Sequence, residues 1–210
     1  MMTGWQECRA RFPWPLRRPA TKPLVHGWHT EELQWAKLLP LIPEDGIVLE
    51  IGAWTGKTSL HIVSTCSRMR LIAVDIWTES APSLGNFWPQ WRADGMMNAA
   101  DTPKSLFLAN LWDRQDRVVP IQADSVAGML AVLACGVAPD LVYVDADHGE
   151  NAVYRDVTTA IEAFPDALIC GHDFTNNDGS EGPVSRAVRH CAAERNLRVD
   201  HIEKVWWYER

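Results

Sequence analysis

The sequence lacks any long apolar run. No stretch approaches the roughly 18 consecutive apolar residues that a membrane-spanning helix needs. The first residues, Met-Met-Thr-Gly-Trp, contain no apolar segment with a small-residue cleavage site. We therefore expect a cytoplasmic protein that is not exported and has no membrane partner.

Cysteine is scarce as well. The chain has five cysteines, an odd number, and they are widely separated with no C-x-x-C pair: Cys8, Cys66, Cys135, Cys170 and Cys191. A disulfide framework needs paired cysteines and a cysteine zinc site needs close spacing, so the sequence argues against both.

Positive charge is the third shortage. The 20 lysines and arginines are outnumbered by 27 acidic residues, which gives a formal net charge of −7. A nucleic-acid footprint needs a basic stripe. Basic residues cluster only between Arg9 and Lys22, where a solvated arm is the simpler interpretation. We predict no nucleic-acid partner.

Short β-branched runs alternate with helical patterns along most of the chain. The pattern predicts strands at 47–51, 71–75, 118–122, 141–145, 167–172, 198–202 and 204–208, and helices at 31–39, 57–65, 125–135, 150–164 and 183–195. Continuously apolar strands separated by helices indicate a mostly parallel sheet covered on both faces. We expect an α/β fold with seven strands, the last one antiparallel.

Two segments depart from this alternation. Residues 1–27 are rich in Pro, Arg and Trp without a period, so we expect an irregular N-terminal arm followed by a single domain at 28–210. Packing of this aromatic arm on a neighbouring chain would give a homodimer. Residues 76–103 form a long irregular insert, and Trp77, Trp88 and Trp91 in it are candidates for the wall of a substrate pocket.

The segment 48–58, Val-Leu-Glu-Ile-Gly-Ala-Trp-Thr-Gly-Lys-Thr, reads as a strand, a glycine turn and the start of a helix. Such a turn exposes backbone amides to an anionic ligand. A P-loop needs four residues between its first glycine and Gly-Lys-Thr, and only Ala53, Trp54 and Thr55 intervene here. A dinucleotide loop needs glycine at position 54. A nucleotide-binding enzyme with a variant P-loop stays open as a minor alternative.

This turn resembles motif I, E-I-G-x-x-x-G, of the class I S-adenosylmethionine (SAM) dependent methyltransferases, which have a Rossmann-like fold. Asp75, at the end of the next strand, stands where the family has the acid that receives the ribose hydroxyls, and Asp124 follows the third strand, where the adenine is contacted. The resemblance implies SAM as cofactor. It assigns the cofactor to Glu50, Gly52, Ala53, Trp54, Thr55, Gly56, Thr58, Asp75, Ile76, Trp77, Asp124, Ser125 and Asp145.

Two further segments narrow the resemblance. Val-Asp-Ala-Asp-His at 144–148 and Ile-Cys-Gly-His-Asp-Phe at 169–174 follow two predicted strands. They resemble segments of the caffeoyl-CoA and catechol type metal-dependent O-methyltransferases, and more closely those of a bacterial family that includes the macrocin O-methyltransferases. Carboxyl ends of strands are where open α/β sheets place their chemistry.

A hydroxyl must lose its proton before it attacks a methyl group, and a divalent ion lowers the hydroxyl pKa. The resemblance implies Mg²⁺ on Asp145 and Asp173, with His172 or Asp147 as a third ligand. Phe174 departs from the catechol pattern, which has an Asn ligand there. A site without metal, with His148 or His172 as general base beside Asp145, therefore stays open.

The sequence thus predicts a SAM-dependent methyltransferase acting on a hydroxyl of a small molecule, a sugar or a natural product. The departure at Phe174, together with the aromatic residues of the arm and the insert, leaves a second hypothesis open, a catalytically idle protein that binds SAM and interacts with a partner.

Overall fold

A single mixed sheet organises the part of the chain that the structure describes. The computed structural model describes residues 2–25, 32–79, 87–95 and 97–209. In these ranges seven strands follow the order β3-β2-β1-β4-β5-β7-β6. They are β1 (Ile47–Ile51), β2 (Arg70–Asp75), β3 (Val118–Gln122), β4 (Leu141–Val144), β5 (Leu168–Gly171), β6 (Arg198–Ile202) and β7 (Val205–Glu209).

The direction of the strands confirms the predicted fold class. The pairs formed among β1 to β5 are parallel, and β7 runs antiparallel to both β5 and β6. Strand β1 pairs with β2 on one side and β4 on the other, so the order of the strands reverses between β1 and β4. In open α/β sheets the carboxyl edge at such a reversal is where ligands bind.

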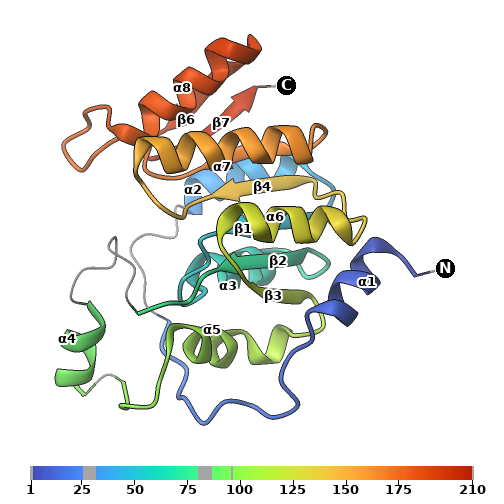
Figure 1. Cartoon of the computed structure of the whole chain (residues 1–210), viewed down its shortest axis with the longest axis vertical. Helices are drawn as coiled ribbons and strands as arrows, with labels where there is room; N and C mark the ends of the chain where they lie inside the picture. Colours follow the sequence, from blue (N-terminus) through green and yellow to red (C-terminus); the bar gives the residue numbers. More distant parts are fainter. Residues whose placement is uncertain (1, 26–31, 80–86, 96, 210) are drawn as a thin grey trace.

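Helices cover both faces of the sheet (Figure 1). One apolar cluster joins the sheet to α1 (Gly4–Arg11), α6 (Ser125–Ala134), α7 (Glu150–Ala163) and α8 (Pro183–Arg195). A second joins it to α2 (Glu32–Leu38), α3 (Lys57–Thr65) and α5 (Pro103–Leu111). Side chains alternate along a strand, so Leu49 and Ile51 of β1 belong to the first cluster and Val48 to the second.

Most predicted elements are confirmed to within one residue at each end. The irregular conformation expected for residues 1–27 is wrong at α1. Thr3 and Gln6 form a capping box there, in which Gln6 N donates to Thr3 Oγ1 and Thr3 N donates to Gln6 Oε1. Trp5 and Cys8 of α1 are buried in the first cluster. The division of the chain into 1–27 and 28–210 stays a prediction.

The N-terminal aromatic residues pack within their own chain. Trp5 lies in the core, and Trp14 Nε1 donates to the Val118 carbonyl at 2.7 Å. Trp5 and Trp14 are among the aromatic residues that we expected to pack on a neighbouring chain, and here they contact their own chain. The homodimer stays a prediction.

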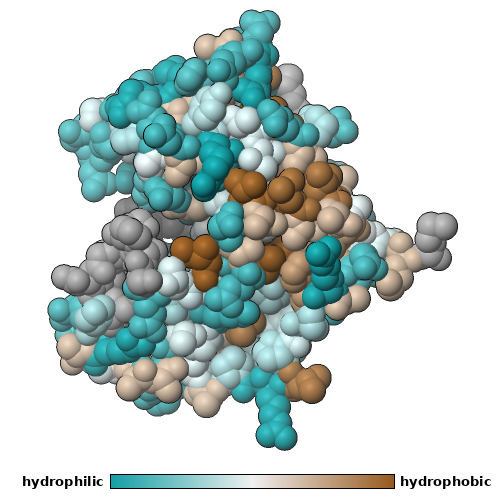
Figure 2. Space-filling view, viewed as in Figure 1, coloured by the Kyte–Doolittle hydropathy of each residue, from teal (hydrophilic) through white to brown (hydrophobic). Residues whose placement is uncertain are grey.

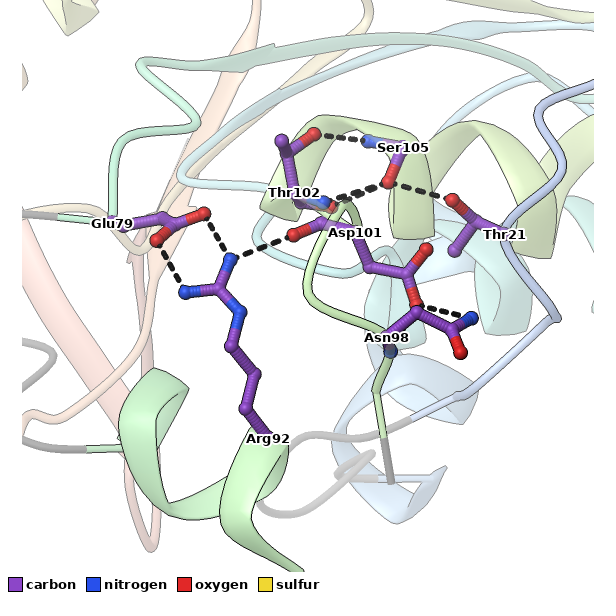
Figure 3. Close-up of polar contacts among 7 residues, drawn as sticks. All are labelled: Thr21, Glu79, Arg92, Asn98, Asp101, Thr102 and Ser105. Carbon is purple, nitrogen blue, oxygen red and sulfur yellow. Dashed lines mark hydrogen bonds and ion pairs between the residues drawn. The ribbon is translucent and has the colours of Figure 1, made fainter. Parts of the chain in front are cut away.

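The insert at 76–103 contains a helix that the sequence analysis missed, α4 (Phe87–Ala93). Residues 80–86 and 96 and the side chain of Trp88 lie outside the described part of the chain. Helix α4 stands beside the sheet edge at which β1 and β2 end (Figure 1). Arg92 fastens it, because its Nη1 and Nη2 donate to Glu79 at 2.8 and 2.6 Å and Nη2 also donates to the Asp101 carbonyl at 2.9 Å (Figure 3).

The described residues also include short 3-10 turns at Leu39–Leu41 after α2 and at Trp112–Arg114 after α5. Apolar residues gather at the surface around α6 (Figure 2), where Leu130 and Leu133 are about half exposed. No helix in the described ranges has the length and apolar character needed to cross a membrane.

Candidate active site

The glycine turn after β1 is packed tightly against the end of β4. Gly52 has a φ of +94°, and a Cβ atom on it would lie 2.0 Å from the backbone oxygen of Asp145. The Asp145 amide in turn donates to the Ile51 carbonyl at 2.8 Å. Gly52 therefore supplies both a left-handed backbone and the space that the neighbouring strand end occupies.

Asp75 connects this turn to the loop after β2. Its Oδ2 accepts from Trp54 N at 2.8 Å and its Oδ1 accepts from Trp77 N at 2.6 Å. Burial raises the pKa of Asp75, although the two backbone hydrogen bonds oppose the rise. Each carboxylate oxygen keeps a second lone pair, so Asp75 can still accept the two hydroxyls of a ribose.

Trp54 and Trp77 both adopt positive φ angles, +49° and +44°. This conformation is strained for a bulky residue and needs support from its surroundings. Part of the support is mutual, since Trp77 Nε1 donates to the Trp54 carbonyl at 2.8 Å. Trp77 is buried and packs on Phe107 of α5, with ring centroids 4.9 Å apart. In the structure this tryptophan packs against the glycine turn and α5.

Glu50 lies beneath the turn and is only 1% exposed. Burial raises its pKa to about 8, while a hydrogen bond from the hydroxyl of Ser59 on α3 acts in the opposite direction. Sequence reasoning did not identify Ser59. A buried carboxyl that needs a donor is the signal that points to it.

The other predicted cofactor residues border the same edge of the sheet. Ala53 and Thr55 are buried, Gly56 is the N-cap of α3 with a φ of +85°, and Thr58 is in the first turn of that helix. Asp124 is the N-cap of α6 and accepts from Ala127 N at 3.1 Å, which leaves its other oxygen for a ligand. Ile76, which is exposed, and Ser125 follow β2 and β3.

Two carboxylates and two histidines converge next to the turn. His148 Nε2 lies 3.2 Å from Asp173 Oδ2 and 3.7 Å from Asp145 Oδ1. His172 Nδ1 lies 3.3 Å from the same Asp173 oxygen and 3.8 Å from Asp145 Oδ1. We call Asp145, His148, His172 and Asp173 the acid–histidine cluster. All four residues were predicted from the ends of β4 and β5.

The charged groups of this cluster shift one another's pKa values. Burial alone would raise the pKa of Asp173, but the hydrogen bond from His172 and the positive charges of His172, His148 and Lys204 outweigh it and lower the pKa to about 2. A hydrogen bond to Asp145 and the negative charges of Asp145 and Asp173 raise the pKa of His148. Burial and the positive charge of His172 oppose this rise but do not cancel it. Asp173 also has a φ of +55°, a left-handed conformation that glycine adopts readily and that asparagine and aspartate adopt more often than other residues.

The cluster fits a divalent cation. Among the described residues, Asp145, His148 and Asp173 offer ligand atoms that all lie within 4.8 Å of one another. This set differs from the predicted one, because His148 supplies the third ligand atom. Asp147 is exposed and accepts instead from Gly149 N at 2.7 Å.

Phe174 does not enter the cluster. It is fully buried and stacks on His201, with ring centroids 4.5 Å apart. The position that carries an asparagine ligand in the catechol pattern is thus part of the packed core in this chain.

Lys204, from the turn between β6 and β7, was not predicted as a site residue. Its Nζ lies 3.5 Å from Asp173 Oδ1 and donates to Asn177 Oδ1 at 2.7 Å. The turn reaches Asp173 because β7 pairs with β5, which sequence spacing does not reveal.

A protein-family model described as a methyltransferase domain matches residues 49–174, which include the glycine turn and the whole cluster. No curated protein matches the sequence at a significant level.

Solved structures share the fold at low sequence identity. Fibrillarin from Aeropyrum pernix with natively bound SAM is 17% identical over 94% of this chain and 85% of its own, with a TM-score of 0.54. A TDP-rhamnose 3′-O-methyltransferase of calicheamicin biosynthesis is 13% identical over 86% and 78%, also with a TM-score of 0.54. An O-methyltransferase family 2 protein from Planctomyces limnophilus, in complex with apigenin, is 12% identical over 83% and 55%, with a TM-score of 0.53.

Proposed function

The chain belongs to the methyltransferase domain family, and from this membership we propose that it transfers a methyl group from SAM to a hydroxyl of a small molecule, such as a sugar or a natural product. One observation carries the proposal. The glycine turn and the acid–histidine cluster are in direct contact, because the backbone of Asp145 fills the space beside Gly52. A methyl donor in the turn would therefore lie beside groups that can activate an acceptor.

The residues around the turn fit SAM. Asp75 offers carboxylate oxygens to the ribose, Asp124 and Ser125 border the place for the adenine, and the α3 amides after Gly56 favour an anionic group. When bound, SAM supplies an electrophilic methyl group on a positively charged sulfur. The natively bound SAM of the fibrillarin neighbour supports this choice of cofactor.

The acid–histidine cluster would activate the acceptor hydroxyl. His148 and His172 can each receive a proton, and Asp145 and Asp173 favour the protonated imidazole electrostatically. Asp145, His148 and Asp173 would hold a divalent ion such as Mg²⁺, which lowers the pKa of a bound hydroxyl. We propose the metal-assisted route because three ligand atoms converge.

The proposed class of acceptor is supported by the net charge of the protein and by the names of its structural neighbours. The net charge of −7 disfavours a polyanionic acceptor such as RNA. One structural neighbour is named as a 3′-O-methyltransferase of TDP-rhamnose, and another is an O-methyltransferase family 2 protein in complex with apigenin. Both support a small hydroxyl acceptor. Other neighbours include a putative rRNA methylase, so an RNA substrate belongs in the acceptor panel.

We propose 28–210 as the methyltransferase domain.

Cofactor binding is the first test. Calorimetry with S-adenosylhomocysteine should give a Kd in the micromolar range, and Asp75→Ala should weaken binding by about tenfold or more because two hydroxyl hydrogen bonds to a charged acceptor are lost. Asp166→Asn, an exposed acid in the turn before β5, is the matched control and should bind as the wild type does. Absence of binding to the wild-type protein at millimolar ligand would refute the proposed function.

Metal removal tests whether a bound divalent ion activates the acceptor hydroxyl. After exhaustive EDTA treatment, turnover of a hydroxyl acceptor should fall by at least about tenfold, since a metal held by Asp145, His148 and Asp173 would lower the pKa of the hydroxyl. Added Mg²⁺ or Mn²⁺ should restore turnover. Activity that is unchanged by EDTA would eliminate the metal and leave the histidines as the proton acceptors.

A further inference from the structure

The N-terminal segment 12–25 runs along α5 and is fastened to it at several points. Arg18 Nη2 donates to the Ala109 carbonyl at 3.5 Å, and Thr21 Oγ1 donates to Ser105 Oγ at 2.8 Å (Figure 3). Ser105 itself belongs to the capping box at the start of α5. The segment is therefore part of the packed structure up to the point where it reaches the glycine turn.

Asn110 of α5 joins this segment to the turn. Its Oδ1 accepts from Leu24 N at 2.8 Å, and its Nδ2 donates to the Leu24 carbonyl at 3.0 Å and to the Thr55 carbonyl at 2.8 Å. The amide side chain thus pairs with both backbone groups of Leu24 as a neighbouring strand would. Its remaining N–H holds Thr55, which is fully buried between the two glycines.

Apolar packing connects the same two segments. Leu24 and Trp54 both pack on a small cluster of Trp91, Met97 and Leu106. Trp54 and Trp91 meet edge to face, with ring centroids 6.0 Å apart. Because Trp91 lies on α4, which Arg92 fastens to Glu79 and Asp101, this cluster is anchored on the insert as well (Figure 3).

The glycine turn benefits from such external contacts. Gly52, Trp54 and Gly56 all have positive φ angles, and the one at Trp54 is costly for an aromatic residue. Strained backbone persists only where its surroundings hold it. Asn110 holds the peptide between Thr55 and Gly56, next to Trp54, and Leu24 packs on the same cluster as the Trp54 side chain.

We infer that Asn110 is a positioning residue for the cofactor and that it couples the order of residues 21–25 to occupancy of the glycine turn. This inference rests on the proposed binding of SAM. Coupling of this kind is reciprocal. A ligand in the turn stabilises the pairing of Leu24, and loss of that pairing weakens the ligand.

The test combines calorimetry with amide hydrogen exchange on the full chain. Asn110→Ala and Asn110→Asp should raise the Kd for S-adenosylhomocysteine about tenfold, because the buried Thr55 carbonyl loses its donor in both variants. In the wild-type protein, the ligand should slow exchange of the Leu24 amide. Neither variant should show this ligand-dependent protection.

Asn98→Ala is the matched control, since it removes an asparagine hydrogen bond to Asp101 within the insert and leaves the turn untouched. It should keep both the wild-type Kd and the protection of Leu24. Circular dichroism at the measuring temperature verifies that each variant is folded. Wild-type protein that fails to bind would refute the proposed function. If the wild-type protein binds but both Asn110 variants keep its Kd, the inference about Asn110 is overturned and the proposed function is not. The same holds if the ligand does not change the exchange rate of the Leu24 amide in the wild-type protein.

Discussion

Replacing Asp173 with asparagine is expected to lower kcat of the methyl transfer by about 1,000-fold, within the range that a lost acid–base or metal group produces. The substitution removes the charge that both histidines and Lys204 face, at 3.2 to 3.5 Å. It keeps the shape of the side chain, and asparagine tolerates the left-handed backbone of this position. The measurement is kcat together with the Kd for S-adenosylhomocysteine.

The affinity for S-adenosylhomocysteine should stay within about threefold of wild type in Asp173→Asn, because in the proposed mechanism this group acts on the acceptor hydroxyl and not on the cofactor. Asp75→Ala should show the opposite pattern, with a large effect on affinity. Asp166→Asn serves again as the control for loss of one negative charge. A variant Asp173→Asn that keeps more than a tenth of the wild-type kcat would contradict a catalytic role for the cluster.

Gly52→Ala is expected to abolish measurable cofactor binding, with a Kd raised by about 100-fold or more, and to lower the free energy of unfolding by about 3 kcal/mol. The added Cβ would lie 2.0 Å from a backbone oxygen of Asp145, which cannot move without shifting the end of β4. The shift would displace the turn and the cluster together. Urea unfolding and calorimetry measure the two effects.

Gly136→Ala is the appropriate comparison for this variant. Gly136 also has a positive φ, +70°, but nothing lies within 4 Å of the position its Cβ would take. It should lose only the roughly 1 kcal/mol that the left-handed conformation costs an alanine, with no change in cofactor affinity. Equal effects of the two substitutions would mean that backbone conformation, rather than contact with Asp145, explains the need for glycine at position 52.

The parts of the site that follow strands directly could be predicted from the sequence. Gly52, Asp75, Asp145 and Asp173 each come within two residues of the end of a predicted strand. Carboxyl ends of parallel strands meet at one edge, so identifying the strands placed these residues together. Only the direction of the strands was needed for this step, and the order of the strands was not.

Residues that reach the site through packing could not be predicted in this way. Lys204 depends on the position of β7 beside β5, and Asn110 depends on α5, which the sequence analysis missed. Helix α5 is buried nearly all round, so its apolar residues show no helical period. The signals that mark it are Thr102 as N-cap and Pro103 in the first turn.

Helix α1 was missed for the opposite reason. Only Trp5 and Cys8 are buried in it, too few to produce a pattern among exposed polar residues. The Thr3 and Gln6 capping box is the local signal that was present. Phe174 was misleading for a third reason, since it was compared with a ligand position although it belongs to the core. Its packing explains why a phenylalanine stands at this position, and the catalytically idle protein stays a prediction for turnover measurements to test.

The position of β7 inside the sheet affects how the sheet assembles during synthesis. A nascent chain that has left the ribosome only as far as Ile202 contains the segments of β5 and β6, but it lacks the strand that lies between them in the folded sheet. The edge of β5, where Cys170 and Gly171 later pair with Trp207 and Trp206, is then unpaired and open to other strands. Because Lys204 arrives with the same segment, the acid–histidine cluster acquires its lysine neighbour only when the sheet closes.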